Sequence, residues 1–72
     1  MRLYNVQLKD MENKLLDNFN VIVGDYEIPT IEVMFIQGLD VIEKYDDIEF
    51  VLTYNDPILG YVTSKHYIYR KE

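Results

Sequence analysis

The sequence predicts a single domain, residues 1–72, that is mainly β: a five-stranded antiparallel sheet or small open barrel with one short helical segment, with an α+β arrangement left open. Three observations predict it. Alanine, the best helix former, is absent, whereas Ile, Val and Tyr, which favour strands, are abundant. Several segments alternate between apolar and polar residues, and glycines and prolines fall between such segments.

The first segment, residues 3–9, alternates as the two faces of a half-buried strand do, and its apolar face holds Tyr4, Val6 and Leu8. Residues 10–18 have no such pattern. Asp10 suits the cap of a short helical turn, and a polar loop fits the same residues, so both alternatives stay open.

A turn signal follows at Gly24-Asp25, between the apolar residues 19–23 and 26–28. Glycine tolerates a positive φ at the first central position of a type II′ turn, and this position suits a two-residue hairpin. The pattern therefore predicts a hairpin formed by the two flanking segments.

Pro29 cannot donate to a sheet ladder and marks an edge position or a bulge before residues 30–37. Within that segment, five of the six residues 31–36 are apolar. Such a run predicts a strand covered on both faces, in the middle of the sheet, which Gly38 ends. The helical segment is expected near residues 39–46 or 10–17, and the former would pack through Leu39, Ile42 and Tyr45.

The C-terminal part predicts a hairpin. Residues 48–54 alternate, and the inward face holds Ile48, Phe50, Leu52 and Tyr54. Asn55-Asp56-Pro57 is a turn signal, and Gly60 closes the loop before the last strand, residues 61–70. The connection is too short for a parallel crossover, so these two strands pair antiparallel.

Negative charge is concentrated in the middle of the chain. Residues 25–56 hold nine acids against one base and carry −8, whereas the two ends together carry +2. The densest part contains five acids within ten residues: Asp40, Glu43, Asp46, Asp47 and Glu49. A solvated loop is one interpretation, because charge runs are most often surface features.

The other interpretation is functional. Carboxylates on a compact fold attract basic surfaces over long range and can imitate the phosphate spacing of nucleic acid. The five acids therefore predict a non-enzymatic interaction module that binds a basic protein surface, including the case of a nucleic-acid-mimicking inhibitor or regulator.

The alternative is a single-stranded nucleic-acid-binding small β-barrel. Bases and aromatics interleave in the last strand, where the candidate residues are Lys65, Tyr67, Tyr69 and Arg70. Two observations argue against nucleic acid as the partner. A chain with a pI of 4.5 carries net negative charge at neutral pH and repels a polyanion. In addition, Tyr61, Tyr67 and Tyr69 share one strand face, where packing on a core is the favoured interpretation.

No catalytic residue, metal site or cofactor is expected. The chain has no cysteine and one histidine, His66, which excludes the usual Cys and His ligand sets of structural zinc. Ser64 lies two residues away on the same face, at an expected spacing of about 7 Å from His66, outside hydrogen-bond reach. The acidic run lacks the central glycine of an EF-hand loop.

Composition also sets expectations about context. The chain has no apolar run of signal-peptide or bilayer-spanning length, which predicts a cytoplasmic protein with no membrane partner. Abundant Ile, Asn, Tyr and Lys without alanine is typical of an AT-rich genome and predicts a low-GC bacterium or its virus. A chain this short buries a small fraction of its surface, which favours a homodimer.

Overall fold

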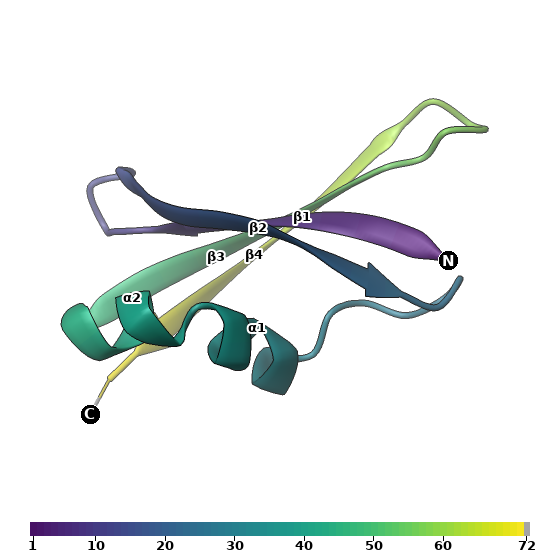
Figure 1. Cartoon of the computed structure of the whole chain (residues 1–72). Coiled ribbons are helices and arrows are strands. Elements are labelled where there is room, and N and C mark those ends of the chain that lie inside the picture. Colours follow the sequence, from purple (N-terminus) through teal and green to yellow (C-terminus); the bar gives the residue numbers. More distant parts are fainter. Residues whose placement is uncertain (72) are drawn as a thin grey trace.

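The computed structural model describes residues 1–71, and in that part of the chain four antiparallel strands and two short helices form the fold (Figure 1). In chain order, the elements are β1 (Arg2–Lys9), β2 (Leu15–Val23), α1 (Ile31–Gln37), α2 (Leu39–Lys44), β3 (Asp47–Asn55) and β4 (Val62–Arg70). The sheet order is β2-β1-β3-β4, and every neighbouring pair is antiparallel. The mainly β prediction is confirmed, but this open sheet has four strands, and the sequence predicted five.

Both helices lie on one face of the twisted sheet (Figure 1), and the core lies between the sheet and the helices. β1 and β3 are the central strands, and their alternation sends every second side chain into this layer. The core consists of Tyr4, Val6, Leu8, Val21, Met34, Ile42, Ile48, Phe50 and Leu52. The predicted inward faces of β1 and β3 are therefore confirmed, with Tyr54 only partly buried at the margin.

Residues 31–37 form helix α1, so the prediction of a central strand was wrong for this segment. Thr30 begins the helix: its backbone is extended, and its side-chain oxygen accepts a hydrogen bond from the Val33 amide at 3.3 Å. The helix spreads the apolar residues around its axis, so Met34 alone is buried among them. A run of apolar residues without a clear period does not distinguish a strand that is buried on both faces from a helix.

The hairpin predicted at Gly24-Asp25 is also absent from residues 1–71. The Glu27 amide donates to the Gly24 carbonyl at 3.2 Å, which closes a turn one residue later than predicted. The chain then leads through Pro29 to α1 and does not return along β2. A tight turn forms here, but no second strand follows it.

β2 makes its hairpin with β1. The turn between them is built on Asp10, whose side-chain oxygen accepts hydrogen bonds from the amides of Glu12 and Lys14, each at 2.9 Å. Of the two alternatives for residues 10–18, the polar loop is confirmed for residues 10–14 and is wrong for residues 15–18, which already belong to β2. A bulge at the start of β2 shifts its register with β1.

The short helix expected near residues 39–46 is confirmed as α2, and Ile42 is buried as predicted. Leu39 and Tyr45, which were predicted to pack with it, are exposed, so that part of the prediction was wrong. Gly38 joins the two helices and is itself buried. A Cβ atom at this position would lie 2.7 Å from Leu8 Cδ2, so only glycine lets the corner between the helices approach β1 this closely.

The predicted C-terminal hairpin is confirmed, since β3 and β4 pair along their full lengths. The Asp56 carboxylate accepts hydrogen bonds from the amides of Ile58 and Leu59 at 2.9 and 2.8 Å. Gly60 closes the loop with a φ of 75°, a left-handed conformation that glycine adopts without steric cost.

Candidate functional site

The folded chain separates its charge into two parts. The helical layer, defined as residues 24–46 between β2 and β3, holds six acids and one base and carries −5. The rest of the chain holds seven acids and six bases and carries −1. Every charged side chain of the helical layer is exposed. The negative charge of the protein is therefore presented mainly from the helix side of the sheet.

The same layer also exposes apolar side chains. One short helix layer cannot turn every apolar residue toward a four-stranded sheet, and Ile36 is 75% exposed. The other exposed large apolar side chains of the layer are Tyr26, Ile28, Ile31, Val33, Leu39 and Tyr45. Acids and apolar groups are thus mixed on one surface, a composition that suits contact with another protein.

The five predicted acids fall on two faces of the sheet. Asp40 and Glu43 lie on α2, and Asp46 follows it, so these three belong to the helical layer. Asp47 and Glu49 flank the buried Ile48 on β3 and therefore point to the face that carries no helix. The structure thus brings three of the five together.

On the open face, each of the two acids has a base directly across from it on a neighbouring strand. Asp47 is paired across the strands with Arg70, and Glu49 with Lys9. Glu49 Oε1 also lies 3.8 Å from His66 Nδ1. Within residues 1–71, this contact and the pair between the N-terminal ammonium and Asp25 are the only contacts between a basic and an acidic group closer than 4.0 Å.

The pKa of Asp25 is lowered from its ordinary value of 3.8, first by the hydrogen bond from the N-terminal ammonium and then by the charge of that group. Asp25 is thus already engaged within the chain. The other acids of the helical layer are Glu27, Glu32 and the three acids near α2. Two bases lie near those three acids: Lys44 on α2, and Lys71, whose ammonium donates a hydrogen bond to the Glu43 backbone carbonyl oxygen at 3.2 Å.

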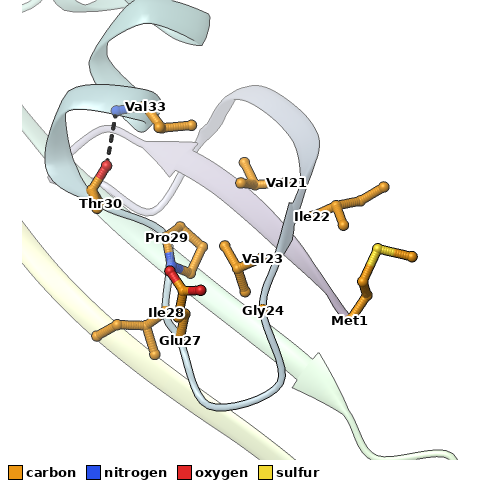
Figure 2. A pocket seen from close by; sticks show the side chains of 10 residues that line it. All are labelled: Met1, Val21, Ile22, Val23, Gly24, Glu27, Ile28, Pro29, Thr30 and Val33. Atoms are coloured by element: carbon orange, nitrogen blue, oxygen red, sulfur yellow. Dashed lines mark hydrogen bonds between the residues drawn. The ribbon is translucent and has the colours of Figure 1, made fainter.

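A pocket of about 440 Å³ lies where β2 ends. Figure 2 shows the chain passing down β2 to Gly24 and returning through Pro29 to Thr30, with the pocket between these two arms. Its lining is apolar except for Glu27 and the Thr30 hydroxyl. The sequence could not indicate it, because the predicted hairpin at this place would have joined the two arms.

The open face of the sheet mixes polar side chains with exposed apolar ones, among them Leu3, Ile22 and Ile68. Asn5 Nδ2 donates hydrogen bonds to Asn18 Oδ1 at 2.6 Å and to Asn20 Oδ1 at 3.2 Å. These three amides tie the outer strand β2 to β1 on the side that no helix covers.

Ser64, His66 and Glu49 form a line on the open face. Ser64 Oγ lies 3.4 Å from His66 Nε2, so the expected 7 Å separation was wrong: the two side chains lean toward each other along β4. The residue order is that of a nucleophile, a base and an acid. The contacts are longer than the roughly 2.6–3.2 Å of an activated nucleophile, and both Ser64 and His66 are exposed. We describe them as a surface polar network.

The residues of the nucleic-acid alternative do not share one surface. Tyr69 lies on the helix side, where its ring packs edge-on against Phe35 at 4.8 Å between centroids. Lys65 and Tyr67 share that side, whereas Arg70 points to the open face. Tyr69 therefore packs against the core, as the favoured interpretation predicted, whereas Tyr61 and Tyr67 are exposed.

Comparisons with protein-family models, curated proteins and solved structures gave no match. Among the described residues, neither helix is long and apolar enough to cross a membrane. In the same part of the chain, no three side chains of His, Cys, Asp or Glu are arranged to hold a metal ion. The charge and shape of the surface therefore carry the functional argument.

Proposed function

We propose that this protein is a non-enzymatic interaction module whose helical layer binds a basic protein surface, in the manner of a small acidic inhibitor or regulator. The observation that carries the proposal is the segregation of charge. The helical layer holds −5 and exposes apolar side chains, whereas the rest of the chain is close to neutral. A complementary partner presents lysine and arginine around an apolar centre.

The two kinds of side chain contribute differently to binding. The carboxylates attract the partner before contact and raise the association rate, over a range of about 8 Å at physiological salt. The apolar side chains supply burial, worth about 25 cal/mol for each Å² removed from water. Asp40 follows the exposed Leu39 and Asp46 follows the exposed Tyr45, so both contributions meet at α2.

Removing three charges from the helical layer tests the proposal. The partner is captured from the native host and purified, and its Kd is measured by calorimetry for the variant Asp40→Asn/Glu43→Gln/Asp46→Asn. We expect Kd to rise about tenfold, because three rim charges together contribute about 1.4 kcal/mol. The salt dependence of Kd should weaken at the same time.

A matched control removes three charges elsewhere. The variant Glu12→Gln/Asp17→Asn/Asp47→Asn has the same net charge as the first, but its changes lie on the β1–β2 hairpin and the open face. Its Kd should change less than about threefold. Equal weakening by both variants would mean that total charge and not the helical layer governs binding, and the proposal would then be wrong.

A further inference from the structure

The two edge strands of the sheet differ in charge. β4 carries Lys65 and Arg70, and charged side chains, lysine above all, are how exposed edges avoid pairing with other chains. β2 has one charge in nine residues, Asp17, and exposes Leu15 and Ile22. Its outer edge has no neighbour in the sheet. Within residues 1–71, this edge is protected by the bulge at its start and by Asp17, which is paired with Leu8 and points to the helix face.

We propose that β2 pairs with β2 of a second copy of this chain, antiparallel about a two-fold axis normal to the sheet, so that two four-stranded sheets become one of eight strands. This goes beyond the proposed function. Such an interface is closed, because each copy uses the same strand. Paired residues must share a face, so the register moves only in steps of two, and full overlap places Phe19 opposite Phe19 of the second copy.

The side chains of β2 match themselves in this register. On the open face, Asn18 meets Asn20 of the second copy, so amides already aligned by Asn5 face further amides. On the helix face, the two Phe19 rings meet at the axis. At the two ends, Leu16 of one copy lies opposite Ile22 of the other and Leu15 lies opposite Val23, so apolar side chains meet at both ends of the pair.

Charge does not oppose this arrangement. Asp17 lies opposite Val21 of the second copy, and four residues along a strand separate the two Asp17 side chains by about 13 Å. That distance exceeds the screening length of about 8 Å at physiological salt. Pairing β4 with β4 would instead bring two basic strands together.

Size and shape support a second copy. The chain exposes 5153 Å², whereas a compact monomer of this mass exposes about 4,700 Å². Its radius of gyration is 12.5 Å, against about 11.2 Å for a compact chain of this length. The excess surface is about 450 Å², a little more than half of the roughly 800 Å² that each partner of a stable dimer contributes.

The apolar pocket continues this surface. It lies at the C-terminal end of β2 and is lined by Val21, Ile22 and Val33. The two-fold pairing brings the first residues of β2 of the second copy, Leu15 and Leu16, to this end. The pocket then receives apolar side chains from the second copy, and both helical layers face the same side of the joined sheet.

Sedimentation equilibrium tests the dimer. From about 10 µM to about 500 µM, the protein should show a mass of twice 8.6 kDa, which Ile22→Lys reduces to the monomer mass. Ile22 is 65% exposed, so the change leaves the core intact, as circular dichroism should confirm. Ile68→Lys on the exposed β4 edge is the matched control and should remain a dimer. A monomeric parent protein, or loss of the dimer in Ile68→Lys but not in Ile22→Lys, overturns the proposal.

Cross-linking tests the register, because the chain has no cysteine of its own. Cα atoms directly opposite across an antiparallel pair lie about 4.5–5.5 Å apart, within reach of a disulfide. Asn18→Cys mixed with Asn20→Cys should therefore give a disulfide-linked dimer on oxidation, and each variant alone should give far less. Equal yields from the mixture and from the single variants would contradict the proposed pairing.

Discussion

Asp56 shows how one side chain fixes the long loop between β3 and β4. The amides of Leu59 and, second, Ile58 donate to its carboxylate and hold the pKa of this group below its ordinary value of 3.8. Because the pKa of Asp56 is lower in the folded state, its interaction stabilises the fold fully at pH values above the pKa of the same group in the unfolded chain. The contribution is lost as the pH falls through 3.8 toward the lower folded-state value.

We therefore predict that Asp56→Asn changes the pH dependence of stability. An asparagine oxygen still accepts both amide bonds but carries no charge, so the variant should be less stable than the parent at about pH 6. The difference should shrink at about pH 3, where the parent carboxylate becomes protonated. Urea unfolding at both pH values measures it. A difference that stays constant with pH would show that the Asp56 charge has no part in holding the loop.

At the scale of the element, the corner between the two helices depends on Gly38. Its position would place a Cβ atom 2.7 Å from Leu8 Cδ2 and 3.2 Å from the Met34 carbonyl oxygen. Leu8 is fully buried in β1, so it has no free space to move into. The corner between the two helices therefore packs closely against the central strand β1 at Gly38.

We predict that Gly38→Ala lowers the free energy of unfolding by about 1–2 kcal/mol, because overpacking costs more than the added helix propensity returns. Denaturant unfolding measures the loss. Leu8→Ala alone should cost about 2–5 kcal/mol, and the double variant should be less destabilised than the sum, because the smaller side chain makes room for the new methyl group. If the double variant loses as much free energy of unfolding as the two single variants together, the steric explanation is wrong.

Strands with clear alternation could be predicted from the sequence, and helix α1 could not. In β1 and β3 the two-residue period reports which side chains are buried, because one face of each strand meets the core. In residues 31–36 the apolar content is high on every side, and the deciding feature is local: Thr30 begins a helix by accepting the Val33 amide. The missing fifth strand follows from this one segment.

The same distinction applies to the candidate site. Asp40, Glu43 and Asp46 were found by counting charge, which needs no fold. Glu32 and the exposed Ile36 were missed, because residues 31–36 were predicted to form a strand covered on both faces and therefore to offer no surface to a partner. The position of Glu49 on the open face follows from the predicted alternation of residues 48–54, whereas Asp47 precedes that predicted strand, so its face was not indicated by the sequence.

At the scale of the whole molecule, the same charges destabilise the free protein and favour binding to a basic partner. The helical layer places six acids with one base on one side of the sheet, and these acids repel one another in the free protein. The N-terminal pair with Asp25 offsets little of this repulsion, because both of its groups are largely exposed. A basic partner, by contrast, gains from every carboxylate that stays unpaired.

We therefore predict that salt stabilises the free protein. At fixed protein concentration, raising KCl from about 10 mM to about 200 mM shortens the screening length from about 30 Å to about 7 Å and should raise Tm by a few degrees. The variant Asp40→Asn/Glu43→Gln/Asp46→Asn should have a higher Tm than the parent at low salt and a weaker response to KCl, because the repulsion is already reduced. A Tm that falls with KCl would mean that attractive pairs outweigh repulsion in the free chain. The carboxylates of the helical layer would then be engaged internally, and not available to a partner.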